Sequence, residues 1–288
     1  MDSVLVLIAA PGSGAISANV TEMLRDFGAA APRWLAEGEA LEVEDFAARA
    51  EFLGAIATLP LDANLVPLAN RRKRLLIADM DSTMIEQECI DELGVMAGIG
   101  DHIKAITARA MRGELDFEGA LKERVKLLKG LEAGIIDTIL RERISFMPGG
   151  RALVATMKAQ GAYTALVSGG FTPFTRKVAA ELGFDENQAN ELIVADGLLT
   201  GEVGNPILGQ QAKLEALRRI TARLGLATAD ALAVGDGAND LAMLGAAGMG
   251  VALHAKPQVQ AEARFRVNHG DLTALLYLQG YAKAEFAA

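Results

Sequence analysis

The sequence has little cysteine and little histidine. Cys89 is the single cysteine among 288 residues, so the chain can form neither an intramolecular disulfide nor a thiolate metal cluster. A buried, inert thiol is the simplest interpretation of Cys89. The three histidines lie far apart and lack the spacing of metal ligands. Disulfide-stapled domains and zinc-centred folds are therefore disfavoured.

Positive charge is also scarce. The chain has 28 Lys and Arg against 37 Asp and Glu, which gives a net charge of −9. This balance argues against nucleic acid as a partner. The exception is the basic run at residues 71–74, beside an expected domain boundary. We interpret it as a solvated linker, because a short isolated run of charge usually faces water.

Long apolar runs are missing as well. No stretch reaches the roughly 18 uncharged residues that a membrane-spanning helix needs, although 51% of the residues are apolar and can form a sizeable core. The first ten residues, MDSVLVLIAA, carry the acidic Asp2 where an export signal has a basic region, so a strand is predicted there. The expected location is the cytoplasm, with no membrane partner.

After residue 70, the sequence alternates between apolar strands and amphipathic helices. Near-continuous apolar runs predict buried parallel strands at 74–79, 163–170, 231–240, 248–253 and 264–267. Helical patterns lie at 151–160, 174–183, 213–225 and 239–248. This alternation predicts an α/β fold with a Rossmann-like parallel sheet, spanning residues 71–288. Residues 191–203 predict a hairpin around Asp196 and Gly197.

Two further blocks differ from that alternation. Residues 84–147 are helical in pattern throughout, with Leu121, Val125 and Leu128 on one face, which predicts a helical cap inserted in the core. Residues 1–70 allow a β-α-β-β-α-β order and form a small α+β domain. In element order this domain resembles an ACT-type module. Such modules often pair, which makes a homodimer plausible.

Two acids, Asp79 and Asp81, follow the first strand of the core. Ligands of parallel α/β sheets bind beyond the carboxyl ends of the strands. One carboxylate there can attack an electrophile such as phosphorus, and the second can act as general acid and base. Taken alone, two acids in a turn are more often simple caps.

The ends of two later strands carry groups that can bind a metal ion and phosphate oxygens. Asp236, Asn239 and Asp240 offer oxygen side chains within the short stretch GDGAND, which suits a hard cation such as Mg²⁺. The hydroxyl and backbone N–H groups of SGG, at 168–170, can hold phosphate oxygens. Lys213, near the start of a predicted helix, can add a positive point charge.

DMDST, SGGF, an isolated lysine and GDGAND, in this order and spacing, resemble the four motifs of the haloacid dehalogenase-type phosphohydrolases. The resemblance covers residues 74 to about 270, and within the superfamily it is closest to the phosphoserine phosphatase family. It implies a helical-bundle cap over the core. It also implies Mg²⁺-dependent hydrolysis of O-phospho-L-serine through an aspartyl-phosphate, the last step of serine biosynthesis.

The resemblance assigns roles to the strand-end residues. It makes Asp79 the nucleophile and Asp81 the proton donor and acceptor. It implies that the phosphoryl oxygens are held by Ser168, by the backbone amide of Gly169 and by Lys213.

The resemblance also assigns the metal site. Mg²⁺ would be held by Asp79, by the backbone carbonyl of Asp81 and by Asp236, with Asp240 supporting the site from behind. Asn239 would contact the phosphate or the water around the metal.

In the cap, the same resemblance places Glu88 on the substrate ammonium group and Arg124 on its carboxylate. An arginine fork matches a carboxylate in bidentate fashion. Met111 and Phe117 correspond to apolar positions that close over the site.

Two alternatives remain open. One is a phosphatase or phosphotransferase of the same fold acting on another small phospho-metabolite. The other is a regulatory binding protein that senses an amino acid through residues 1–70 and has an inactive core. The intact set Asp79, Asp81, Lys213 and Asp236 argues against the second.

Overall fold

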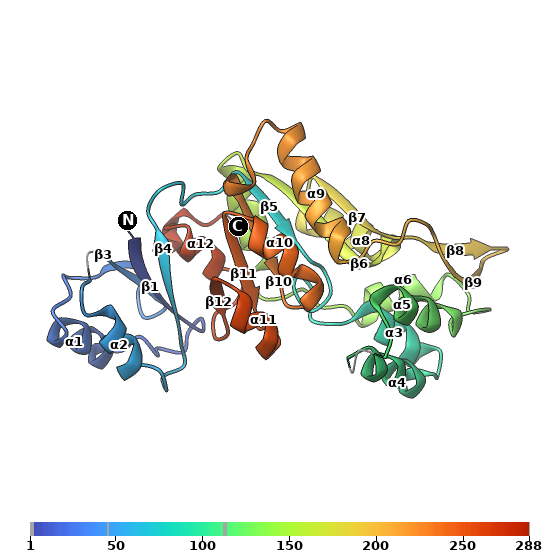
Figure 1. Cartoon of the computed structure of the whole chain (residues 1–288), viewed down its shortest axis with the longest axis horizontal. Coiled ribbons are helices and arrows are strands. Elements are labelled where there is room, and N and C mark those ends of the chain that lie inside the picture. Colours follow the sequence, from blue (N-terminus) through green and yellow to red (C-terminus); the bar gives the residue numbers. More distant parts are fainter. Residues whose placement is uncertain (1–2, 45, 112–113, 288) are drawn as a thin grey trace.

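The computed structural model describes residues 3–44, 46–111 and 114–287. Figure 1 shows an N-terminal domain in blue at one end, a central sheet flanked by helices, and a group of green helices at the other end. The longest described helix has 14 residues. No helix in these ranges combines the length and the apolar character of a membrane span.

The N-terminal domain is a four-stranded antiparallel sheet with two helices. Its elements are β1 (Ser3–Ala9), α1 (Ala18–Asp26), β2 (Arg33–Ala36), β3 (Ala40–Glu44), α2 (Arg49–Ala55) and β4 (Leu61–Pro67), with strand order β2-β3-β1-β4. The β-α-β-β-α-β order predicted from the sequence is present. Alternate residues of β1 face opposite sides, so Leu5 and Leu7 pack under the helices while Val4, Val6 and Ile8 join the main core.

The central sheet has six strands in the order β12-β11-β10-β5-β6-β7. They are β5 (Leu75–Ala78), β6 (Tyr163–Phe171), β7 (Glu186–Asn190), β10 (Ala231–Gly235), β11 (Met249–Leu253) and β12 (Phe265–Val267), and all neighbours are parallel. The predicted α/β fold is confirmed and each predicted strand is present, but the strand predicted at 231–240 ends at Gly235 and a 3-10 helix occupies residues 238–240. β7 was not predicted, because its sequence ENQAN lies at the sheet edge and shows no apolar run.

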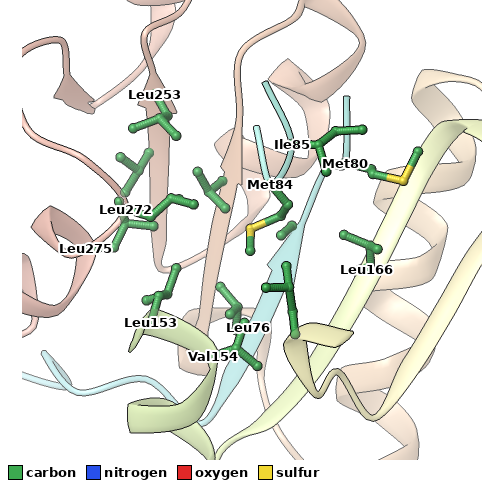
Figure 2. Close-up of a cluster of buried hydrophobic side chains, with 14 of the residues drawn as sticks. Leu76, Met80, Met84, Ile85, Leu153, Val154, Leu166, Leu253, Leu272 and Leu275 are labelled. Atoms are coloured by element: carbon green, nitrogen blue, oxygen red, sulfur yellow. The ribbon is translucent and has the colours of Figure 1, made fainter. Parts of the chain in front are cut away.

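Helices cover both faces of this sheet, as a buried parallel sheet requires. One face carries α9 (Gln210–Arg223), α10 (Leu241–Ala246) and α11 (Pro257–Glu262), and the other carries α7 (Gly150–Ala159), α8 (Thr172–Leu182) and α12 (Ala274–Leu278). In β5, Leu75 and Ile77 face the first layer and Leu76 and Ala78 the second. Figure 2 shows the second layer, where Leu76 lies among side chains that include Leu153, Val154, Leu166 and Met84.

Between β5 and β6 the chain forms the helical cap: α3 (Cys89–Met96), α4 (Gly100–Met111), α5 (Phe117–Lys126) and α6 (Ile135–Glu142). Leu121, Val125 and Leu128 are buried together, as predicted. The prediction of helix throughout 84–147 is wrong at both ends. There the two connections between cap and core run side by side, and Ile85 pairs with Phe146 in an isolated antiparallel bridge.

The predicted hairpin is confirmed as β8 (Leu192–Ala195) and β9 (Leu198–Val203). Asp196 and Gly197 have φ of 51° and 78°, the positive values that a tight two-residue hairpin turn needs. The hairpin packs on the cap, because Leu199 N–H donates to the Leu131 carbonyl and Gly130 N–H to the Leu199 carbonyl, both at 2.8 Å. It therefore ties a segment of the core to the cap.

The N-terminal domain attaches to edge strand β12 through side chains of β4. Asn64 Nδ2 donates to the Arg266 carbonyl at 2.8 Å, and its Oδ1 accepts from Arg266 N–H at 2.9 Å. Asp62 accepts from the backbone N–H groups of residues 268–270. These contacts satisfy an exposed sheet edge that would otherwise be open to pairing.

The basic run at 71–74 is only in part the solvated linker that the sequence suggested, because Arg72 and Arg74 are exposed but the side chains of Arg71 and Lys73 are enclosed. Arg71 forms an ion pair with buried Glu42 at 2.7 Å, and its Nε donates to the Leu278 carbonyl at 2.7 Å. Lys73 is buried, and its Nζ donates to the Ala229 carbonyl at 2.7 Å. Arg71 thus joins the N-terminal domain to the core, whereas Lys73 binds a carbonyl of the core alone.

Candidate active site

The carboxyl ends of three adjacent strands, β10, β5 and β6, meet at one cavity. Its volume is about 890 Å³. From the sheet side, its lining includes Asp79 and Asp81 after β5, Ser168 to Gly170 in β6, and Asp236 after β10. From the cap side, it includes Glu88, Asp91, Phe117 and Arg124. Two segments far apart in the sequence thus enclose one space.

Asp79 is held on both oxygens. Met80 N–H donates to Oδ1 at 2.7 Å, and Lys213 Nζ lies 2.6 Å from Oδ2. Lys213 is 1% exposed and lies equally close, at 2.6 Å, to Asp240 Oδ1. Burial lowers the pKa of Lys213, but the carboxylates of Asp79 and Asp240 outweigh burial and raise it overall. Lys213 is therefore a permanent cation behind the cavity wall.

Asp81 lines the same cavity and also lies close to Glu88 of the cap. Burial raises the pKa of Asp81 well above its usual range, and the nearby charge of Glu88 raises it further. Cys89 N–H donates to Asp81 Oδ1 at 3.3 Å, which opposes the rise. A carboxyl that keeps its proton more readily than usual can donate it to a leaving group.

Three carboxylates, those of Asp79, Asp236 and Asp240, each present an oxygen within 4.8 Å of the others. Burial, followed by the charge of Asp79, raises the pKa of Asp240 to about 7, although Lys213 opposes this. Burial likewise raises the pKa of Asp236. Such crowding of buried acids is unfavourable without a cation, and hard oxygen donors at this spacing fit a divalent metal ion.

Glycines bring the motif backbones close to these acids. A Cβ at Gly170 would lie 2.7 Å from Asp81 Oδ2, and one at Gly235 would lie 2.3 Å from Asp240 Cγ. Gly235 is not among the residues with positive φ. The glycine of GDGAND at this position is therefore needed for room and not for an unusual backbone turn.

On the cap side, Glu88 and Arg124 face the same cavity. Ser82, at φ 54°, donates its hydroxyl to Glu88 Oε1 at 2.8 Å. Burial raises the pKa of Glu88 and lowers that of Arg124, while Asp91 and Glu88 favour the charged form of the guanidinium. Arg124 Nε donates to the Ala120 carbonyl at 3.2 Å, a bond that does not use the two terminal nitrogens of the guanidinium.

Phe117 begins α5 and bridges cap and core. A Cβ at Gly169 or at Gly209 would lie 3.1 Å from its ring, so the ring rests on two bare backbone segments of the core. The backbone of Met111 ends α4, and the side chain of Met111 lies outside the described part of the structure.

The structure brings the other sequence-predicted residues together. Asp79, Asp81, Glu88, Phe117, Arg124, Ser168, Gly169, Asp236 and Asn239 line the cavity, and Lys213 and Asp240 form its buried backing through Asp79. Their chemical roles remain predictions.

Sequence reasoning missed several residues. Thr83 is fully buried, and its hydroxyl donates to Asp236 Oδ1 at 3.1 Å. It follows Asp81 within DMDST, so its place in that motif was an available signal. Asp91, Lys256 and Gln258 also line the cavity, and nothing in their local sequence indicated this.

Comparisons with known proteins agree with this geometry. The profile of the haloacid dehalogenase-like hydrolase family matches residues 76–245. The HAD family hydrolase t0658 from Salmonella enterica serovar Typhi has a similar structure, with a TM-score of 0.85 and 30% identity over 96% of this chain and 98% of that one. The probable phosphoserine phosphatase from Vibrio cholerae, unliganded, gives a TM-score of 0.79 and 31% identity over 98% and 88% of the two chains.

Among curated proteins, a phosphoserine phosphatase from Streptomyces coelicolor is 44% identical over 81% of this chain and 57% of its own length. The chain spans 54–65% of the length of this relative and two others like it.

A parallel sheet with paired acids at its strand ends and a helical insertion above them defines a phosphohydrolase-type site. The chain belongs to the haloacid dehalogenase-like hydrolases and, within them, to the phosphoserine phosphatase family.

Proposed function

We propose that this protein hydrolyses O-phospho-L-serine to L-serine and phosphate in a Mg²⁺-dependent reaction. One observation carries the proposal: the acids and the lysine suited to phosphoryl transfer share one cavity with Glu88 and Arg124 of the cap. The names of the relatives support the same substrate.

In the proposed reaction, a carboxylate oxygen of Asp79 attacks phosphorus while the bond between phosphorus and the serine oxygen breaks. Asp81 gives its proton to that oxygen, and serine leaves. Asp81 then takes a proton from water as the water oxygen attacks the aspartyl-phosphate, and the bond to Asp79 breaks to release phosphate. The raised pKa of Asp81 fits the first of these proton transfers.

The residues present fit a bound Mg²⁺, since buried carboxylates converge within 4.8 Å. Asp79, Asp236 and the backbone carbonyl of Asp81 would hold it, with Asp240 behind them. The ion would supply positive charge to the phosphoryl oxygens. Ser168, Gly169 and Lys213 would hold the same oxygens as charge redistributes.

Selectivity for phosphoserine would come from the cap. Glu88 suits the substrate ammonium group, and Arg124 suits the carboxylate. The pKa of each is shifted by burial toward its neutral form, so each gains from a partner of opposite charge. An ester lacking these groups would give neither residue an oppositely charged group of the substrate, which disfavours its binding.

The proposal is tested by phosphate release from O-phospho-L-serine with Mg²⁺. Parallel reactions hold phosphothreonine, p-nitrophenyl phosphate and glycerol phosphate, and Asp79→Asn serves as the inactive control. We expect a strong preference for phosphoserine, lost in the variant and with EDTA. Turnover of the generic ester alone would contradict the substrate. Turnover of none would favour a sensor with an inactive core.

A further inference from the structure

Asn190 ends β7, is 2% exposed, and binds two separate segments of the chain with one side-chain amide. Its Nδ2 donates to the Gly169 carbonyl at 2.8 Å and to the Leu208 carbonyl at 3.2 Å. Its Oδ1 accepts from Leu208 N–H at 2.7 Å. A buried amide with both ends satisfied fixes the backbone that it touches.

The first segment is the irregular end of strand β6 at residues 168–170, where the pairing register with β7 shifts; we call it the Ser168 turn. The peptide unit between Gly169 and Gly170 is held at both ends: Asn190 binds its carbonyl, and its N–H donates to Ser168 Oγ at 2.9 Å. Because the peptide is planar, the carbonyl sets the direction of the N–H. Ser168 Oγ accepts that N–H, so its own hydroxyl proton is available to a phosphoryl oxygen.

The second segment leads into the helix that carries Lys213. Leu208 precedes Gly209, the residue that caps the N-terminus of α9, and Lys213 N–H donates to the Gly209 carbonyl at 3.4 Å. Asn190 therefore fixes where α9 begins relative to the Ser168 turn.

The cap rests on the same two segments. The ring of Phe117 packs against Gly169 and Gly209, and a Cβ added at either glycine would lie 3.1 Å from a ring carbon. Asn190 and Leu208 also flank the β8–β9 hairpin, whose Leu199 exchanges backbone hydrogen bonds with the cap. One amide thus connects the Ser168 turn, the segment before α9 and the two glycines against which Phe117 of the cap packs.

We propose that Asn190 is a positioning residue, which holds the Ser168 turn and the start of α9 at the separation that lets Ser168 and Lys213 converge on one phosphoryl group. This inference rests on the proposed function for the chemistry at that point. Asn190 itself does not line the cavity and acts through the backbone.

The test compares Asn190→Ala and Asn190→Asp with Asn187→Ala. Asn187 lies on the same strand, is exposed, and accepts from the Thr175 hydroxyl at 3.1 Å, so it is a control for the loss of an amide hydrogen bond outside the two segments. The aspartate variant keeps an acceptor for Leu208 N–H but turns a carboxylate toward two carbonyls. Three quantities are measured with Mg²⁺ present, at a temperature where melting curves show every variant folded. These are the dissociation constant of inorganic phosphate, by calorimetry, and kcat and KM for O-phospho-L-serine.

We expect kcat/KM to fall about tenfold to a hundredfold in both Asn190 variants, the range for a misplaced catalytic group. We also expect weaker phosphate binding in both, with Asn187→Ala unchanged. A substitution by Asp as harmful as one by Ala identifies donation from Nδ2, to the carbonyls of Gly169 and Leu208, as the contribution that matters.

The proposal is overturned if the folded Asn190 variants bind phosphate and turn over esters like the parent protein, with only a lower melting temperature. The proposed substrate can fail separately. If the parent protein hydrolyses p-nitrophenyl phosphate but not phosphoserine, the proposed substrate is wrong. The Asn190 variants are then compared by their kcat and KM for p-nitrophenyl phosphate and by their phosphate binding.

Discussion

Lys213 Nζ lies 2.6 Å from Asp79 Oδ2, with Lys213 only 1% exposed. The lysine therefore cannot be an ordinary solvated cation. It is enclosed with Asp79 on one side and Asp240 on the other, and it keeps the crowded acids at the strand ends from being a cluster of uncompensated negative charge.

Lys213→Met should remove both stability and activity. Removing the cation leaves two buried carboxylates unpaired, which costs about 3–5 kcal/mol when one partner of a buried pair is lost. Phosphoserine hydrolysis should fall by at least about a hundredfold, because a charge that stabilises the transferred group is lost. Urea unfolding and initial rates measure the two effects.

Lys177→Met is the matched control for Lys213→Met. Lys177 lies on α8, is 56% exposed and pairs with Glu181 on the surface, so we expect little change in the free energy of unfolding. Near-parental rates in folded Lys213→Met would contradict a role for the lysine in holding phosphoryl oxygens.

The cap residues should control which ester is hydrolysed. Glu88→Gln keeps an acceptor for the Ser82 hydroxyl, which donates at 2.8 Å in the parent protein, but loses the negative charge. Arg124→Lys keeps the positive charge but loses the planar fork. In each variant, kcat/KM for phosphoserine should fall by about a hundredfold or more, while p-nitrophenyl phosphate turnover stays within a few-fold.

Glu118→Gln, at an exposed position of α5 that pairs with Lys122, is the control for these cap variants and should leave both substrates unaffected. Equal losses of activity toward both esters in the Glu88 and Arg124 variants would instead indicate damage to the phosphoryl site. That result would contradict the assignment of the ammonium and carboxylate contacts.

The sequence was informative where local pattern and tertiary environment coincide. Strands β5, β6 and β10 are buried on both faces, so their apolar runs stood out. The acids after β5 and β10 could be predicted to meet, because parallel strands end at one edge of a sheet. The helical repeat of Leu121, Val125 and Leu128 likewise reported a real buried face.

Contacts between distant segments could not be predicted in this way. The polar sequence of β7 is a strand only because it pairs with β6. The hydrogen bond from Thr83 to Asp236 joins residues 153 positions apart, and strand order alone does not specify which side chains will bond. Arg71 looked like part of a solvated run, since only the docked N-terminal domain brings Glu42 to it. These are tertiary effects that override local propensity.

Removing the metal should be visible without any assay of turnover. Oxygens of Asp79, Asp236 and Asp240 lie within 4.8 Å, and a bound Mg²⁺ would relieve their repulsion. At 100 times its dissociation constant, a ligand that binds only the folded state adds about 2.7 kcal/mol of stability. The melting temperature should therefore rise with Mg²⁺ and return with EDTA.

In Asp236→Asn the Mg²⁺-dependent rise in melting temperature should disappear, because one of the proposed ligands loses its charge. Asp101→Asn, on the exposed start of α4, should keep the full rise. An unchanged Mg²⁺ response in the Asp236 variant would show that the ion binds elsewhere.

The junction between the N-terminal domain and the core should depend on Asp62. This carboxylate is 4% exposed and accepts backbone N–H groups from Asn268, His269 and Gly270 at 2.6, 2.9 and 2.8 Å. Asp62→Ala leaves those donors without an acceptor at the sheet edge, which should cost about 2–4 kcal/mol. Calorimetry should show the N-terminal domain melting before the core.

Asp26→Asn, exposed on α1, should melt like the parent protein. A single, unshifted transition in Asp62→Ala would mean that other contacts, such as that of Arg71 with Glu42, are enough to hold the two domains together.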